Sequence, residues 1–400
     1  MMTWYEALAW TLIAAPLVIG GYAFVLYPAV VWVWSRFRPA PVWPPAPQEW
    51  PNVTILIVAY NEERRLPQTI KQALAADYPA DRLGLLVVSD CSSDGTDELV
   101  RNYGDPRVRL LRMSERRGKA AGENASGAEI TSDIVVSIDA AILIPRDSLK
   151  HLIRAMLDPE VGVASGRDLS VGDELREGNQ AESSYVGLEM QLRHLETRVR
   201  SIVGASGCFY AARRELHLVQ FPETMSRDFA AASNAVRHGF RAVSVDDATC
   251  LVPRARTLRA ELRRKSRTME RGLETLLFMR GMMNPFRYGS FSFMMVSHKL
   301  LRWLLFPSFL GWIIGPILLV RSAPHTSILL IGMLVGIALG VLASRWPEGS
   351  PPPRIVAIPG YVFVSIMAGW LAWWQLFRGH KSATWEPTRR PEVALPGGDK

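Results

Sequence analysis

Two kinds of hydrophobic pattern occur along the 400 residues of the chain. Long apolar runs without a charged residue lie near both ends, and the middle alternates short apolar runs with polar turns. The short runs predict strands over Val53–Ala59, Leu85–Ser89, Val108–Leu111 and Ile134–Ile138. Helical stretches between or after them are Leu66–Ala76, Asp94–Tyr103, Ala120–Ala128 and Asp147–Met156. This alternation predicts an α/β fold, a mostly parallel sheet with helices on both faces.

The apolar runs near the ends predict transmembrane helices. Ala7–Ser35, Trp303–Val320 and Ile355–Phe377 carry no charged residue and meet or approach the roughly 20 residues that cross a bilayer. Ile328–Ala343 is shorter and needs its flanks to span. The first run lacks a basic leading segment and is too long for a signal peptide, so we expect a retained anchor.

These boundaries divide the chain into six segments. We expect an N-terminal transmembrane helix in residues 1–38, a proline-rich extended linker in 39–51 and one α/β domain in 52–283. The mixture of aromatic, methionine and basic residues in 284–302 predicts an amphipathic helix at the membrane interface, or alternatively a core helix of the domain. About three spans follow in 303–378, and a basic tail in 379–400.

The formal net charge of +8 narrows the choice of partners. The basic residues gather beside apolar runs, and Arg36 and Arg38 follow the first run directly, so that end is expected to face the cytoplasm. No feature besides the net charge favours nucleic acid as a partner, so we expect that the protein does not bind nucleic acid. The three cysteines, Cys91, Cys208 and Cys250, have no zinc-like spacing.

Polar residues follow the predicted strands where each strand ends. Asn61 and Glu62 come after the first strand, Asp90 after the second and Asp94 four residues later. Open α/β sheets bind ligands at the carboxyl ends of their strands. These acids, the amide and Lys119 therefore predict a site for a ribose, a base and a diphosphate.

The motifs VTILIVAYNEE, LLVVSDCSSDGT, GKAAGENAS and IVVSIDA occur in this order, and from Val53 to Gly272 the chain resembles the membrane-bound family-2 glycosyltransferases. Relatives of this kind include synthases of cellulose, hyaluronan and poly-N-acetylglucosamine. The resemblance implies a GT-A-like (Rossmann-like) domain in which Asp90 binds uracil or ribose. Glu62, Asp94 and Lys119 map to neighbouring nucleotide contacts; alternatively, Asp94 caps a helix and Lys119 is a solvated lysine.

The second half of the domain carries the expected base. GASGCFYAARREL, which contains Gly207, resembles the acceptor-side glycine-rich segment of the family. In SRDFAAASNAVRHGF, Asp228 matches the second member of a paired acid motif, the expected general base. Arg227 stands where the family has an acid, and such a neighbour favours the ionised but less basic form of the carboxylate. Alternatively, Asp228 is only a helix N-terminal charge.

An arginine-rich segment, RRKSRTMERG, lies where the family has a Gln-x-x-Arg-Trp motif. Arg267 matches the arginine, and Arg264 and Thr268 replace the glutamine and the tryptophan. The resemblance implies that Arg267 acts on the leaving diphosphate, with Arg264 and Arg271 beside it, since a guanidinium fork suits phosphate oxygens. The alternative is a solvated basic face near anionic lipid.

The largest departure concerns the metal. The family has Asp-x-Asp after the fourth strand, where this chain has Asp139, Ala140 and Ala141. We expect a divalent cation, Mg²⁺ or Mn²⁺, at Asp139, although an alanine supplies no ligand. Asp139 with water, another acid or substituting arginines could each compensate.

The sequence thus predicts an inverting glycosyltransferase in the bacterial inner membrane with a cytoplasmic catalytic domain. It would transfer a sugar from a nucleotide donor, UDP-linked, to a growing polysaccharide or a lipid-linked glycan, in contact with membrane lipids. The alternative, motivated by Ala141 and Arg227, is a degenerate relative that serves as a scaffold or regulatory subunit in envelope glycan assembly.

Overall fold

The chain forms two compact units. A computed structural model describes residues 2–171, 177–253, 258–346, 353–379 and 384. Of the described residues, the helical unit comprises 2–34, 177–185, 258–346 and 353–379, and the sheet unit comprises 35–171, 186–253 and 384. Most of the predicted basic tail, residues 379–400, lies outside the described residues.

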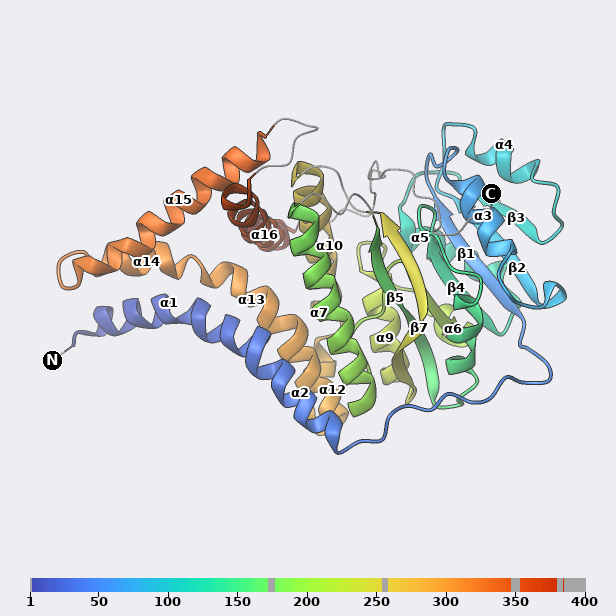
Figure 1. Ribbon diagram of the computed structural model, residues 1–400, viewed down its shortest axis with the longest axis horizontal. Coiled ribbons are helices and arrows are strands. Elements are labelled where there is room, and N and C mark those ends of the chain that lie inside the picture. Colours follow the sequence, from blue (N-terminus) through green and yellow to red (C-terminus); the bar gives the residue numbers. More distant parts are fainter. Residues whose placement is uncertain (1, 172–176, 254–257, 347–352, 380–383, 385–400) are drawn as a thin grey trace. The chain divides into compact units, whose positions relative to one another are not determined.

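Seven strands form one sheet in the order β3-β2-β1-β4-β6-β5-β7 (Figure 1). β1 is parallel to β2 and β4, β2 to β3, and β5 to β7, whereas β6 is antiparallel to both β4 and β5. The predicted mostly parallel sheet is therefore confirmed. The strands are β1 (Val53–Ala59), β2 (Leu83–Ser89), β3 (Val108–Arg112), β4 (Ile134–Asp139), β5 (Val161–Val171), β6 (Phe209–Arg213) and β7 (Arg241–Pro253).

Helices cover both faces of this sheet. On one face, buried residues of α3 and α6, such as Leu66 and Leu149, share one hydrophobic cluster with alternate residues of β1, β2 and β4, such as Ile55. On the other face, α5 contacts β1 and β2, and α9 packs its alanines against β5 and β7. The helices of the sheet unit are α3 (Leu66–Leu74), α4 (Thr96–Arg101), α5 (Lys119–Ala125), α6 (Ser148–Met156), the part of α7 (Glu177–Val199) from residue 186 on, α8 (Arg214–His217) and α9 (Arg227–Arg237).

Close packing of α5 brings its first residue near the carboxyl edge of the sheet. A Cβ added at Gly122 would lie 2.7 Å from Cγ1 of Val58 and 3.3 Å from Cγ1 of Val88. Only glycine allows this approach without a shift of the strands. Lys119, one turn earlier on α5, is consequently positioned beside the end of β4, where its ammonium meets Asp139.

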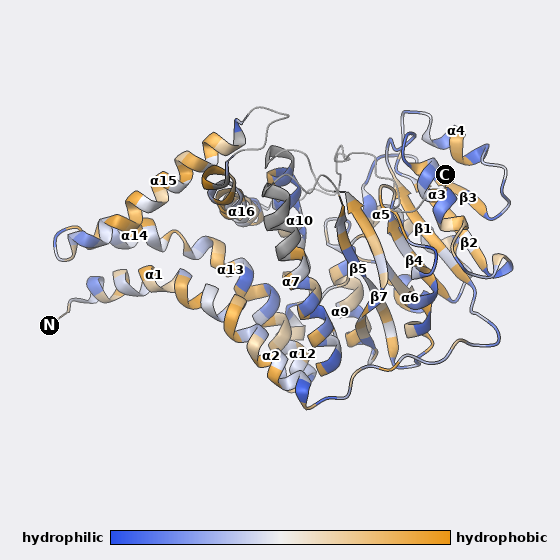
Figure 2. Ribbon diagram, in the orientation of Figure 1, coloured by the Kyte–Doolittle hydropathy of each residue, from blue (hydrophilic) through white to orange (hydrophobic). Residues whose placement is uncertain are grey.

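The helical unit contains the apolar runs. Among the described residues, three helices are long and apolar enough to cross a membrane, Trp4–Arg36, Pro324–Ala343 and Ile355–Phe377, and a bent pair, Ser290–Ser308 with Gly311–Leu318, could form a fourth. Figure 2 shows apolar residues spread along α1, α13, α14 and α15. The helices of the helical unit are α1 (Trp4–Gly21), α2 (Tyr27–Arg36), α10 (Leu258–Phe278), α11 (Pro285–Tyr288), α12 (Ser290–Met295), α13 (Leu301–Ser308), α14 (Gly311–Leu318), α15 (Ser327–Ser344) and α16 (Arg354–Phe377).

The segment predicted as one interfacial helix, residues 284–302, is built from several pieces. α11 and α12 are followed by a π-helical segment, Val296–Leu300, that leads into α13. Phe291, Met294 and Met295 are buried, and Ser297 lies 2.8 Å from the Tyr22 hydroxyl of the N-terminal helix. These side chains pack inside the helical unit, so the amphipathic composition reflects contacts between helices as well as polar positions.

Candidate active site

Asp90 directly follows β2 and fixes the loop that precedes α5. Its carboxylate is fully buried and accepts hydrogen bonds from the backbone N–H groups of Arg117 (2.8 Å) and Gly118 (2.9 Å). Gly118 has a φ of 97°, a conformation that favours glycine. A nucleotide that reached Asp90 would therefore meet a carboxylate whose position is already fixed by two backbone donors.

Two residues with a left-handed backbone lie directly after β1 and β2. Asn61 has a φ of 53° and Cys91 a φ of 59°. The Asn61 side-chain oxygen accepts from the backbone N–H of Ser93 (2.8 Å), which ties the two loops together. Non-glycine residues in this region store strain of about 1–3 kcal/mol and cluster at functional sites. The predicted nucleotide rim is thus a rigid pair of turns.

Glu62 and Asp94 lie in the same pair of turns. Asp94 Oδ1 accepts from the backbone N–H and the hydroxyl of Thr96 (3.1 and 2.5 Å), just before α4. Glu62 forms an ion pair with Arg65 (3.5 Å), and its backbone N–H donates to the Thr96 hydroxyl (3.0 Å). Asp94 thus holds Thr96 at the start of α4, but the N-cap of that helix is Gly95, which has no side-chain cap bond. Nucleotide contact by Glu62 and Asp94 stays a prediction.

Lys119 joins the expected metal acid to the acceptor-side glycine segment. Its ammonium donates to Asp139 Oδ1 (2.6 Å) and to the Gly207 carbonyl (2.8 Å). Burial alone would lower the pKa of Lys119, but the negative charges of Asp139 and Glu123 outweigh it and raise the pKa. Lys119 is therefore a permanent cation at this edge and not a solvated surface lysine.

Asp228 lies in the first turn of α9, next to the same glycine segment. Its Oδ1 accepts from the Ser226 hydroxyl (2.5 Å), and a Cβ added at Gly207 would lie 3.3 Å from its Oδ2. The absence of a side chain at Gly207 leaves that face of the carboxylate open. The structure thus brings together four residues expected from the sequence, Asp139, Lys119, Gly207 and Asp228. The role of base stays a prediction.

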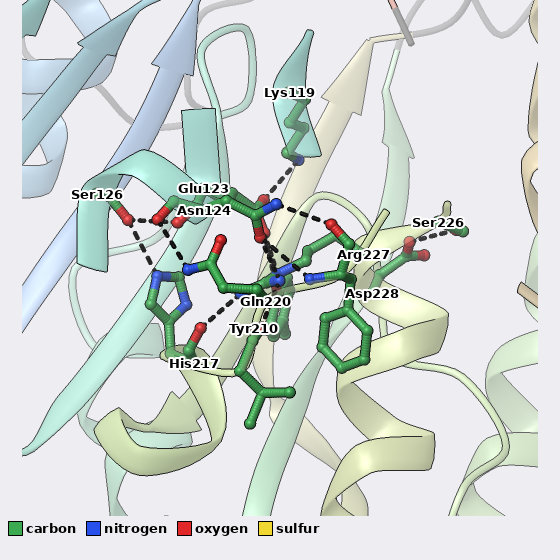
Figure 3. A network of polar contacts seen from close by, with 12 residues as sticks. Lys119, Glu123, Asn124, Ser126, Tyr210, His217, Gln220, Ser226, Arg227 and Asp228 are labelled. Carbon is green, nitrogen blue, oxygen red and sulfur yellow. Dashed lines mark hydrogen bonds and ion pairs between the residues drawn. The ribbon is translucent and has the colours of Figure 1, made fainter. Parts of the chain in front are cut away.

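Behind these residues lies a buried polar network that the sequence did not predict (Figure 3). Glu123, one turn after Lys119, is 1% exposed and pairs with Arg227 (3.3 Å) and with the Tyr210 hydroxyl (3.0 Å). Burial raises the pKa of Glu123, and the charges of Lys119 and Arg227 oppose that rise. Burial and Arg227 lower the pKa of His217 to about 3, so this histidine is neutral. The one sequence feature that could have indicated this network is the carboxyl of Glu123 within the mostly small and apolar segment GKAAGENAS.

A resident divalent ion fits these residues poorly. Asp139 Oδ1 already accepts the Lys119 ammonium, and Ala141 has no ligand atom. Over the described part of the chain, no group of three or more His, Cys, Asp and Glu side chains could hold a metal ion. The protein alone therefore offers one carboxylate where a hard cation needs several oxygen ligands.

The arginines expected on the diphosphate lie on α10, in the helical unit. Arg264 donates to the carboxylate of Glu261 one turn earlier (2.7 and 3.0 Å), and the neighbouring Lys265 donates to Ser365 of α16 (2.8 Å). α10 packs along α16. A role for Arg264, Arg267 and Arg271 at the diphosphate stays a prediction.

Comparison with known proteins identifies the fold and the domain. Mannosyltransferase PcManGT of Pyrobaculum calidifontis, solved with GDP-Man and Mn²⁺, matches with a TM-score of 0.70 at 23% identity over 94% of this chain and 100% of that chain. The sheet unit thus has the GT-A fold of glycosyltransferases. Residues 54–218 match the family model of glycosyl transferase family 2, so the chain carries a family-2 glycosyltransferase domain.

Two curated relatives match parts of the chain. Probable glycosyltransferase YdaM of Bacillus subtilis (strain 168) is 30% identical over 137 residues, 32% of this chain and 32% of that protein. Poly-beta-1,6-N-acetyl-D-glucosamine synthase of Staphylococcus aureus (strain COL) is 24% identical over 234 residues, 57% and 56% of the two chains. The matches thus span from about a third to about half of these relatives' length.

Proposed function

We propose that this protein is a membrane-bound inverting glycosyltransferase that moves a sugar from a UDP-linked donor to a polysaccharide or lipid-linked acceptor. The observation that carries the proposal is the grouping of Asp139, Lys119, Gly207 and Asp228 at the carboxyl edge of the sheet. The family-2 domain match and the relatives named for glycan synthesis support it.

Each residue of this group has a defined task in the proposed reaction. Asp228 takes the proton of the acceptor hydroxyl, whose oxygen attacks the anomeric carbon as the bond to the diphosphate breaks. Lys119, kept cationic, stabilises the negative charge that develops on the leaving diphosphate. Asp90 holds the base or ribose of the nucleotide. Arg267, with Arg264 and Arg271, adds positive charge from α10.

A divalent ion enters this proposal only with the nucleotide. A bound Mg²⁺ or Mn²⁺ would supply further positive charge at the diphosphate, as the Mn²⁺ of the solved mannosyltransferase complex suggests. Asp139 is the one residue of the expected motif that could hold it. Because Ala141 contributes no ligand, the phosphate oxygens must complete the site, and binding to the nucleotide-free protein is weak.

The proposed location is the bacterial inner membrane, with the sheet unit in the cytoplasm. The three or four apolar helices of the helical unit support membrane insertion. Arg36 and Arg38 follow the first of them and favour the cytoplasmic side for that end.

A panel of donors tests the proposed function. Purified protein in lipid is incubated with radiolabelled UDP-glucose, UDP-N-acetylglucosamine or GDP-mannose and a bacterial lipid and oligosaccharide extract. We expect label to enter one acceptor fraction from a UDP-sugar, with release of UDP. Transfer only from GDP-mannose would correct the donor. Nucleotide binding without transfer from any donor would favour the scaffold alternative, which Ala141 motivates.

A further inference from the structure

Arg227 occupies the position of an expected acid, yet its side chain is buried and bonded inside the protein. It is the first residue of α9 and is 6% exposed. Figure 3 shows Arg227 in one polar network with Glu123, Asn124 and His217, with Asp228 beside it. An arginine buried in this way must be matched by acceptors, because an uncompensated buried charge is strongly destabilising.

Four acceptor groups contact the guanidinium of Arg227. Its Nη1 donates to the Val219 carbonyl (3.0 Å) and to the Asn124 side-chain oxygen (2.8 Å), and its Nη2 donates to the His217 carbonyl. Its Nε pairs with Glu123 Oε2 (3.3 Å). The planar fork of arginine suits several fixed acceptors at once, which a lysine ammonium cannot match. These contacts fasten the first residue of α9 to α5 and to the segment after α8.

Glu123 accepts Arg227 next to a second cation and a hydroxyl donor. The Tyr210 hydroxyl of β6 donates to the same oxygen, Oε2 (3.0 Å), and the Lys119 ammonium lies 4.0 Å from Oε1. Asp139, Lys119, Glu123 and Arg227 therefore form a row of alternating charges from the end of β4 to the start of α9. Each charge in this row has an opposite neighbour, so none is buried alone.

The end of this row lies beside the proposed base. Asp228 follows Arg227 in the chain, and its carboxylate is held on one side by the Ser226 hydroxyl. A shift of the first turn of α9 would move the Asp228 carboxylate away from the glycine segment. Misplacement of a reacting group by about 1 Å can lower a rate by about 10²-fold.

We propose that Arg227, held by Glu123, is a positioning residue that fixes the first turn of α9 so that Asp228 faces the acceptor. The inference rests on the proposed function of Asp228 as the base. It replaces the expectation that an arginine at this position weakens the base: the guanidinium is engaged behind the site and orients the carboxylate.

Variants of the pair separate positioning from stability. Arg227→Met and Glu123→Met each leave one buried charge alone, so both single variants should melt at lower temperature than the wild type. The double variant E123M/R227M removes both charges and should melt at a higher temperature than either single variant, although below the wild type, because the Tyr210 hydroxyl and the acceptors of Arg227 lose their partners. It does not restore the bonds to the His217 and Val219 carbonyls, so we expect its kcat to stay about 10- to 100-fold low. Arg227→Lys, which keeps the charge without the fork, should also lower kcat.

The full-length protein in lipid is measured for melting temperature, UDP affinity, donor KM and kcat. Expected for the double variant are wild-type UDP affinity and donor KM with a reduced kcat. The matched control is Arg107→Met, which removes an arginine ion pair with Asp105 (2.7 Å) at the opposite edge of the sheet and should leave kcat unchanged. Recovery of kcat together with melting temperature in E123M/R227M would overturn the positioning role. A wild type that transfers no sugar from any donor would overturn the proposed function and this inference with it.

Discussion

The two halves of the sheet unit hold their polar residues by different means. In the half formed by β1 to β3, Asp90 is bound by backbone N–H groups, and the turns are fixed by left-handed residues. In the half formed by β4, β6 and α9, side chains bind side chains, through Lys119 with Asp139 and Arg227 with Glu123. Backbone donors stay in place when a neighbouring side chain changes, whereas a charge pair fails when either member is lost. We therefore expect substitutions in the first half to affect binding and those in the second to affect turnover.

The substitution with the largest expected effect is Asp228→Asn. It keeps the size of the side chain and removes its basicity, so the sugar-transfer rate should fall by about 10²–10⁴-fold. UDP affinity should remain that of the wild type, because Asp228 is expected to contact the acceptor and not the nucleotide. Turnover and calorimetric titration with UDP are measured on the same preparation. Wild-type turnover in this variant would rule out Asp228 as the base.

Asp90→Ala, unlike Asp228→Asn, should weaken the binding of UDP. Loss of the carboxylate removes the predicted contact to the nucleotide and leaves two backbone donors without their acceptor, so UDP binding should weaken by about 1–3 kcal/mol. The protein should also melt at a lower temperature. Asp105→Ala, in the turn before β3, is the control for loss of an aspartate and should leave UDP affinity unchanged. Equal UDP affinity in Asp90→Ala and wild type would place the nucleotide elsewhere.

The same contrast explains what could be predicted from the sequence. The apolar run Val53–Ala59 has the same bounds as β1 because a buried parallel strand needs a continuous apolar segment. Asp90, the acid that follows the neighbouring strand β2, marks the carboxyl edge of the sheet. β5 to β7 were not predicted, since their runs contain glycine, arginine and aspartate. The partnership of Glu123 with Arg227 joins positions far apart in the chain, and no local pattern specifies it.

The pH dependence of stability tests the buried network. The pKa of His217 falls from 6.5 to about 3, so the folded state excludes a proton that the unfolded state binds. The contribution of neutral His217 to the free energy of unfolding is fully present above about pH 6.5 and is lost as the pH falls toward 3. At pH 5 the free energy of unfolding should be lower by about 2 kcal/mol. His217→Asn should remove this part of the dependence.

Thermal unfolding of the wild type, His217→Asn and His151→Asn is compared at pH 7 and pH 5. His151, a partly exposed histidine of α6, is the control for the loss of an imidazole. If the melting temperature of His217→Asn falls with pH as steeply as that of the wild type, His217 is not kept neutral by its surroundings.

The smallest expected effect belongs to Ala141→Asp, at the boundary between the two halves. Asp139 ends β4 and is engaged with Lys119, so a second carboxylate two residues later would add a hard oxygen ligand where the wild type has none. Mg²⁺ or Mn²⁺ should then bind more tightly, and the metal concentration for half-maximal activity should fall, most clearly at low nucleotide concentration, where the phosphates supply few ligands. Activity and UDP affinity are measured against metal concentration for both proteins. Coincident curves would mean that residue 141 does not face the diphosphate, and the row of charges from Asp139 to Arg227 would then lie deeper than the nucleotide.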